Sequence, residues 1–243
     1  MLLAAGLGER LRPLTLTTPK PLIPVGGRPL IEYNLILLKK FGVKKVMINL
    51  HHLGGMIREQ IGDGKKWELD IQYSEEEKIL GTGGGVEKVK GFFENQPFFL
   101  INADILIDLD LKKLSEFHNS QKTLATLVVT STTRKDIQNW VFSNHKDQIV
   151  KIGEESPDPD LRQSVFTGVH LIEPEILSLL PSGRPSCIIQ DTYVPGLARR
   201  KKLSAYPFEG YWRDLGTPER YGEVQKEFAS GWPYTTLKPD DFT

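Results

Sequence analysis

Apolar stretches of strand length alternate with amphipathic stretches through the first half of the chain. The short apolar runs are typical of buried strands, whereas the longer stretches repeat apolar residues every three or four positions, as helices do. The order strand, helix, strand predicts a mainly parallel sheet with helices on both faces. The expected strands are 1–5, 45–50, 69–74, 98–105 and 123–132, and the expected helices are 29–42, 54–62, 83–93 and 110–120.

The second half of the chain is less regular, but it shows no break in composition, no repeat and no low-complexity segment. We therefore predict a Rossmann-like α/β fold with a single domain over residues 1–229. A tail at 230–243 has no periodicity, and we expect it to be loose. Thr217 is the expected N-cap of the last helix, with Pro218 at its first position. The expected strands are 140–143, 148–152, 164–172 and 203–208, and the expected helices are 173–180, 189–200 and 217–229.

The charge balance narrows the classes of function. The chain has 243 residues, of which 31 are basic and 31 acidic. A neutral balance argues against a protein that coats nucleic acid, but it allows a local phosphate site. Cys187 is the only cysteine, which excludes an intrachain disulfide. No apolar run approaches the ~18 residues of a membrane span, and no basic segment precedes an apolar one at the N-terminus. We expect a soluble, cytoplasmic protein that binds neither nucleic acid nor membrane.

A basic, glycine-started loop follows the first apolar run, "GLGERLRPLTLTTPKPL" at residues 6–22. The chain has no G-x-x-x-x-G-K-[ST] loop, and a G-x-G-x-x-G reading fails because Leu11 occupies the third glycine position. Gly6 and Gly8 can let backbone N–H groups face an anion at close range. The loop is thus either an ordinary surface loop or a site for several phosphates.

The cations of this loop suit the second alternative. Arg10 can fork onto phosphate oxygens. Lys20 lies between Pro19 and Pro21, which restrict the backbone and favour an extended conformation at the lysine. A lysine that is held in this way can be aimed at one ligand atom.

The segment "LAAGLGERLRPLTLTTPKPLIPVGGRPLIEY" at 3–33 resembles the signature of the sugar-1-phosphate nucleotidyltransferases, L-A-A-G-x-G-x-R-[LM]-x-P-L-T followed by P-K-P-L-x-P-V. The resemblance implies an enzyme that joins a nucleoside triphosphate (NTP) to a sugar-1-phosphate and releases pyrophosphate. It also implies a monomer or a small homo-oligomer. It continues through "LGTGGGVEKV" at 80–89, "LINADI" at 100–105, "FTGVHLIEPEIL" at 166–177 and "GYWRDLGTPERY" at 210–221.

Two acids match the metal ligands of the family. Asp104 ends an apolar strand, at the edge where open α/β sheets bind ligands, and Asp214 lies in "WRDLG". The resemblance implies that both hold Mg²⁺, which suits hard oxygen ligands. The alternative is that each acid only caps a turn.

Other residues take their expected roles from the same resemblance. Arg10 matches the residue that holds the β- and γ-phosphates, and Lys20 the one near the α-phosphate and the sugar phosphate. Arg12 suits a solvated or structural role equally well. Each glycine or threonine position has a structural alternative: a tight strand–helix junction, a flexible turn or a β-bulge. The implied nucleotide-binding residues are Leu3, Ala4, Ala5, Gly6, Gly8, Thr82 and Gly83, and the implied sugar-binding residues are Thr167 and Gly168.

The acidic run 75–77 could place a hydrogen-bonding group near the base, although such a run is more often solvated. The chain departs from the family pattern at Ser156, where many relatives have a lysine for the sugar phosphate, and at Ala103, where many have glycine. Relatives also begin about three residues earlier, which leaves the natural start open. No further domain follows, so we expect a transferase-only enzyme.

Within the family, the "TGGG" form and the "GYWRDLGT" ending most resemble the N-acetylmuramate-1-phosphate uridylyltransferases of peptidoglycan recycling in the bacterial cell wall. The alternatives are a mannose- or heptose-1-phosphate guanylyltransferase and a non-catalytic regulatory protein that binds a nucleotide-sugar. A glycosyltransferase would show a D-x-D metal motif directly after the strand. Asp108-Leu109-Asp110 has this form, but it lies further on and is expected to enter a helix.

Overall fold

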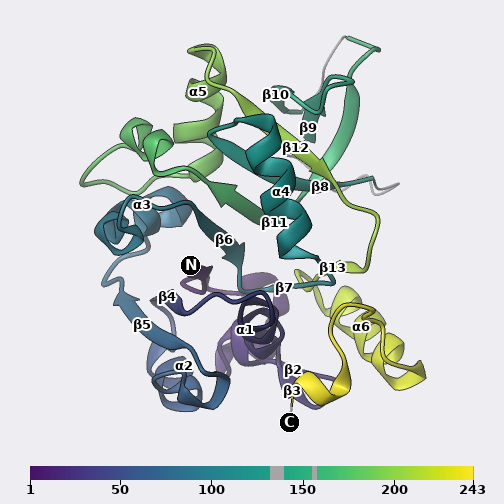
Figure 1. The fold of residues 1–243 in the computed structure, drawn as a ribbon. Helices are drawn as coiled ribbons and strands as arrows, with labels where there is room; N and C mark the ends of the chain where they lie inside the picture. Colours follow the sequence, from purple (N-terminus) through teal and green to yellow (C-terminus); the bar gives the residue numbers. More distant parts are fainter. Residues whose placement is uncertain (132–139, 155–157, 243) are drawn as a thin grey trace. The chain divides into compact units, whose positions relative to one another are not determined.

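The computed structural model describes residues 1–131, 140–154 and 158–242. Their contacts divide the chain into two compact units, each built from segments that are distant in sequence (Figure 1). The first unit comprises Met1–Ile79, Ile101–Asp110 and Gly210–Thr243, and the second comprises Leu80–Leu100 and Leu111–Glu209. Each unit is described separately.

A parallel sheet forms the centre of the first unit. Its strands are ordered β6–β1–β4–β5, and every pairing among them is parallel. In β4 the five residues after Lys45 are buried, as expected for a strand covered on both faces. Because the strands are parallel, their carboxyl ends share one edge. The strands are β1 (Leu2–Leu3), β4 (Lys45–Leu50), β5 (Asp70–Glu75) and β6 (Phe98–Asn102), of which β6 begins in the second unit.

Three α-helices belong to the first unit: α1 (Leu30–Lys40), α2 (Gly54–Ile61) and α6 (Pro218–Ser230). The sequence predicted each of them to within two residues at either end. The side chain of Thr217 accepts a hydrogen bond from the amide of Arg220, which confirms the predicted N-cap, and Pro218 follows it at the first helical position. Helix α1 buries all of its first nine residues.

The predicted strand 98–105 is not continuous. Strand β6 ends at Asn102, Ala103 and Asp104 form a turn, and β7 (Ile105–Ile107) begins afterwards. Strand β7 pairs with β13 (Trp212–Asp214) in a separate antiparallel pair, a partner that the local apolar pattern does not reveal. A second small pair joins β2 (Pro24–Val25) to β3 (Arg28–Pro29).

The second unit is built on antiparallel pairs in the order β10–β9–β11–β8, with β12 parallel to β8. The predicted helix 173–180 is a 3₁₀-helix (Pro174–Leu179), and 189–200 is a π-helix (Ile189–Tyr193) followed by α5. The other elements are β8 (Ala125–Thr130), β9 (Trp140–Ser143), β10 (Ile149–Gly153), β11 (Arg162–Ile172), β12 (Leu203–Pro207), α3 (Gly81–Lys88), α4 (Leu111–Gln121) and α5 (Val194–Ala198). The predicted α/β class with a mixed, mainly parallel sheet is confirmed.

We expected the C-terminal tail to be loose, but the C-terminal segment 231–242 is packed against the first unit. Trp232 and Tyr234 pack around Tyr33 of α1, and Leu237 is fully buried. Burial of these aromatic rings attaches the segment to α1, although its sequence has no periodic apolar pattern.

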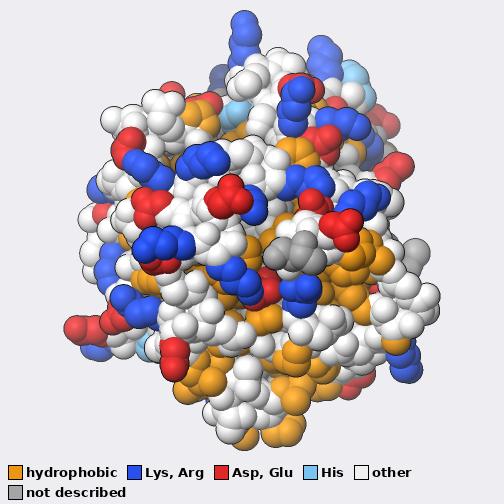
Figure 2. Space-filling view, turned by 60° about the horizontal axis from the view of Figure 1, so that its bottom comes forward, with side chains coloured by type: hydrophobic (Ala, Val, Ile, Leu, Met, Phe, Trp, Pro, Cys, Tyr) orange, Lys and Arg blue, Asp and Glu red, His pale blue; other side chains and the backbone are white. Residues whose placement is uncertain are grey.

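The surface agrees with the neutral composition. Basic and acidic side chains are intermixed over the face shown in Figure 2, with no extended field of one sign. Among the described residues, no helix has the length and apolar character needed to span a membrane.

Candidate active site

The glycine-started loop winds through short 3₁₀ turns at the carboxyl edge of the first unit's sheet. Gly8 has a φ of +65°, and a Cβ there would lie 2.8 Å from Cγ2 of Thr15, so both backbone and packing require glycine. The hydroxyl of Thr15 donates to the carbonyl of Gly8 and closes the loop. Gly6 differs, because a Cβ there would meet no protein atom within 4 Å. The protein's own packing therefore leaves open space beside Gly6.

Lys20 lies in a 3₁₀ turn (Lys20–Leu22), which corrects the expected extended conformation. The turn is closed by the amide of Leu22, which donates to the carbonyl of Pro19. Only 9% of the lysine side chain is exposed, and its Nζ lies 2.5 Å from Oδ2 of Asp104. This partly buried ion pair brings together a cation and an acid that are 84 residues apart in the chain.

Asp214 reaches the same region because β13 pairs with β7. Asp214 is opposite Ile105 in the register, and the amide of Leu215 donates to the carbonyl of Asp104. Oδ2 of Asp214 accepts a hydrogen bond from Nη1 of Arg220 at 2.6 Å. Both acids are partly exposed, Asp104 to 35% and Asp214 to 27% of the side chain.

Gly216 is the point where the charged groups converge. A Cβ at this position would lie 3.0 Å from Nη1 of Arg220, 3.0 Å from Oδ1 of Asp214 and 3.2 Å from Nη2 of Arg10. The missing side chain lets two guanidinium groups and a carboxylate approach one another.

Gly216 and Arg10 also line a cavity of about 490 Å³. The glycine loop forms one wall, and the charged lining residues are Glu9, Arg10, Lys20 and Asp104. Backbone amides and cations around a cavity can hold several phosphate oxygens, and the acids can hold a hard cation. The lining residues are Gly6, Leu7, Gly8, Glu9, Arg10, Leu11, Lys20, Ile79, Asp104 and Gly216.

A buried polar chain connects the start of the loop to a second cavity of about 210 Å³. The amide of Ala4 donates to Oδ1 of Asn49 at 2.8 Å, and Nδ2 of Asn49 donates to Oε1 of Glu76 at 2.7 Å. Glu76 lines the cavity and is only 4% exposed. At this acid, the acidic run is therefore not solvated as such runs usually are.

Leu3, at the end of β1, and the buried Ala5 lie in the first unit, whereas the other four predicted residues lie in the second unit and hold its structure. Thr82 Oγ1 accepts from the amide of Ile188, and the amide of Gly83 donates to the carbonyl of Ser186. Thr167 is buried and donates to the carbonyl of Val128. Gly168 has a φ of +95° where the register shifts between Phe166 and His170, as a β-bulge requires. Their predicted contacts with a ligand stay predictions.

Residues that the sequence reasoning did not select also shape the site. Gly216 and Arg220 follow Asp214 within six positions, so the segment "DLGTPER" places a glycine and a cation close to the predicted metal ligand. Asn49 is the penultimate residue of a predicted strand, near the sheet edge where a polar side chain favours a binding role. Ser156, where relatives carry a lysine, lies outside the described residues.

Comparison with known proteins agrees with this geometry. A nucleotidyl transferase family model matches residues 1–231. The chain is 32% identical over 232 residues to mannose-1-phosphate guanylyltransferase from Mycobacterium tuberculosis. The aligned region covers 95% of the chain and 64% of the relative. It is 30% identical over 238 residues to UTP–glucose-1-phosphate uridylyltransferase from Synechocystis sp., covering 92% and 61%.

The fold also matches a crystal structure from Bacillus anthracis assigned as a glucose-1-phosphate thymidylyltransferase. The TM-score is 0.80 at 24% identity, over 93% of both chains. The chain spans somewhat less than two thirds of the length of the curated relatives above. The family match over nearly the whole chain shows that this protein belongs to the nucleotidyl transferase family.

Proposed function

We propose that the protein transfers a nucleotidyl group from an NTP to a sugar-1-phosphate. A phosphate oxygen of the sugar-1-phosphate attacks the α-phosphorus, the bond from the α-phosphorus to the bridging oxygen breaks, and pyrophosphate leaves. The observation that carries this proposal is the Lys20–Asp104 ion pair beside a glycine-walled cavity of the first unit. Two anions must meet in this reaction, so charge neutralisation and positioning dominate its catalysis.

The residues around the cavity suit separate tasks. Backbone amides near Gly6 and Gly8 face the triphosphate, where open space beside Gly6 allows close approach. Arg10 binds the outer phosphates through its planar guanidinium. Lys20 is buried and fixed by Asp104, so its ammonium neutralises charge at the reacting phosphates with little loss of side-chain entropy.

The two acids fit a divalent cation. Asp104 and Asp214 lie at adjoining ends of the β7/β13 pair and are partly exposed, and carboxylate oxygens are the ligands that Mg²⁺ prefers. A bound Mg²⁺ would neutralise phosphate charge. Lys20 and Arg220 each bond to one of these carboxylates and so orient it.

Glu76 bears on which nucleotide base the protein binds. A carboxylate accepts hydrogen bonds from the two donors on the edge of guanine, whereas uracil offers only one N–H donor. The buried Glu76 is joined through Asn49 to Ala4, at the start of the phosphate loop. These contacts favour GTP at least as much as the predicted UTP. Several relatives are named mannose-1-phosphate guanylyltransferases, so GTP with mannose-1-phosphate has at least as much support as the predicted UTP with N-acetylmuramate-1-phosphate.

A substrate matrix tests the activity. Four NTPs are each combined with mannose-1-phosphate, glucose-1-phosphate, heptose-1-phosphate and N-acetylmuramate-1-phosphate in the presence of Mg²⁺, and released pyrophosphate is measured. Asp104→Asn and Asp214→Asn are expected to lower kcat by about a hundredfold to a thousandfold, the scale seen when a key electrostatic group is lost. Asp63→Asn, at an exposed acid whose side chain pairs with nearby Lys65, is the control with unchanged kcat.

The outcomes separate the alternatives. Pyrophosphate release by the wild type, lost in both site variants, supports the proposal. Tight binding of an NDP-sugar without turnover of any pair would instead support the non-catalytic regulatory protein. If Glu76 contacts guanine, Glu76→Gln should lower kcat/KM for GTP more than for UTP, and equal losses would refute that contact.

A further inference from the structure

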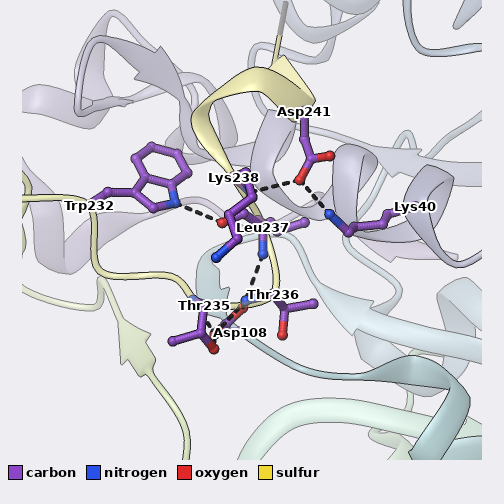
Figure 3. Close-up of polar contacts among 8 residues, drawn as sticks. All are labelled: Lys40, Asp108, Trp232, Thr235, Thr236, Leu237, Lys238 and Asp241. Carbon is purple, nitrogen blue, oxygen red and sulfur yellow. Dashed lines mark hydrogen bonds and ion pairs between the residues drawn. The ribbon is translucent and has the colours of Figure 1, made fainter.

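Asp108 is almost completely buried at the end of β7, where it gathers hydrogen bonds from the C-terminal segment 231–242 (Figure 3). Oδ2 accepts from the amide and the hydroxyl of Thr235 at 2.7 and 2.5 Å. The amide of Thr236 donates to both oxygens at 2.8 and 3.1 Å, and that of Leu237 donates to Oδ1 at 3.4 Å. Both carboxylate oxygens are therefore engaged, and Asp108 is not the open metal ligand that a D-x-D motif would need.

The same segment has a second, independent attachment. Trp232 Nε1 donates to the carbonyl of Leu237, which shapes the segment into a compact turn. Asp241 accepts from Nζ of Lys40 on α1 and from the amide of Lys238, both at 2.7 Å. Figure 3 shows Asp108 and Asp241 on opposite ends of this turn. Asp241 ties the segment to α1, whereas Asp108 ties it to β7.

Strand β7 needs such a tie. It pairs only with β13 among the described strands, and each strand of this pair has three residues. A short two-stranded pair is marginal by itself, and β7 has a further hydrogen bond to α1, from Nδ2 of Asn34 to the carbonyl of Ile105 at 3.1 Å. Asp104 and Asp214 lie at one end of this pair and are bound separately by Lys20 and Arg220, so the geometry of the pair sets the separation of the two acids.

The backbone of Asp108 closes the far end of that pair, because its amide donates to the carbonyl of Tyr211 at 2.9 Å. At the near end, the amide of Leu215 donates to the carbonyl of Asp104. Asp108 is four residues from Asp104, about 13 Å along an extended strand, so its side chain acts on the site only through the strand.

We propose that Asp108 is a positioning residue that fixes β7 against β13 through the C-terminal segment, and thereby sets the separation of Asp104 and Asp214. This inference rests on the proposed function of those two acids. Loss of the hydrogen bonds to Asp108 keeps both acids in the protein but lets the distance between them vary. The affinity for a cation that both acids must bind then decreases. The effect falls on metal use and not on nucleotide binding.

The experiment compares Asp108→Asn with Asp241→Asn, which breaks the ion pair of the same segment with Lys40. Mn²⁺ serves as the probe, and its direct binding is measured by electron paramagnetic resonance beside the Mg²⁺ dependence of pyrophosphate release. Asp108→Asn should raise the Mn²⁺ Kd and the Mg²⁺ concentration for half-maximal rate by about tenfold, the scale of hydrogen bonds to a charged group. The KM for NTP at saturating Mg²⁺ should stay within about twofold, and Asp241→Asn should change neither metal value.

A milder variant tests the same inference if Asp108→Asn does not fold. Thr235→Val removes one hydroxyl bond to Asp108 and keeps the backbone bonds, so it should raise the Mn²⁺ Kd by about threefold. Unchanged Mn²⁺ binding in the folded variants, or equal effects of Asp108→Asn and Asp241→Asn, would overturn the inference. A wild type that binds Mn²⁺ but turns over no substrate pair would overturn the proposed activity alone, since the binding comparison still tests Asp108.

Discussion

At the residue scale, the three cations of the loop at residues 6–22 differ in their surroundings, and we expect their variants to differ accordingly. Lys20 is buried on Asp104, so Lys20→Ala should lower kcat by about a hundredfold or more and change NTP affinity less. Arg10→Ala should mainly raise the KM for NTP and weaken pyrophosphorolysis. Arg12 is exposed and bonds only to Glu9 among the described residues, so Arg12→Ala is the matched control. Steady-state kinetics in both directions measure these values, and wild-type turnover in Lys20→Ala and Arg10→Ala would make residues 6–22 an ordinary surface loop.

Two glycines six residues apart allow a second test at this scale. Gly216→Ala places a methyl group 3.0–3.2 Å from the ends of Arg220, Asp214 and Arg10, which must then move apart. We expect kcat/KM to fall by about tenfold with little change in the free energy of unfolding, because flexible side-chain ends can shift. Gly222→Ala in α6 meets no atom within 4 Å and should raise the free energy of unfolding by about 0.5–1 kcal/mol without changing kcat/KM. Equal kinetics in the two variants would refute the role of Gly216.

At the element scale, the pattern of apolar residues predicted the longer helices and strands, whose periodicity is set by local burial. The buried run of β4 and the apolar spacing of α1 were recognised within two residues, because burial on one unit's sheet imposes their periodicity. Strands β7 and β13 were not separated from their surroundings, because each has three residues and is defined by a partner distant in sequence. The same holds for the candidate site. The sequence predicted which glycines, cations and acids belong to it, but not their convergence at Gly216, which depends on the β7/β13 register.

Strand β11 carries an element-scale prediction about pH. Burial lowers the pKa of His170 to about 3, well below the ordinary histidine value of 6.5. Between these pH values the unfolded chain binds a proton that the native chain does not, so stability is complete above about pH 6.5 and falls as pH decreases. The slope from this histidine is at most about 1.4 kcal/mol per pH unit. In urea titrations at pH 7 and 5, His170→Gln should lose less stability between the two pH values than the wild type does. His145→Gln, at an exposed histidine, should match the wild type, and identical pH dependence in all three proteins would contradict this prediction.

At the scale of the whole molecule, a neutral chain with intermixed surface charges should distinguish an NTP from a polyanion. A ligand that binds only the native state at 100 times its Kd adds about 2.7 kcal/mol to the free energy of unfolding. For a chain of this length that corresponds to a rise in Tm of roughly 5–10 °C, measured by scanning calorimetry with the NTP and Mg²⁺. Heparin at 0.15 M salt (an ordinary physiological value) should leave Tm unchanged, because Arg10 and Lys20, the cations proposed to bind phosphate, line a single cavity and the whole chain carries as many acids as bases. Lys20→Ala should reduce the rise with NTP, and a rise with heparin as large as that with NTP would show that the loop is a general anion surface and not a nucleotide site.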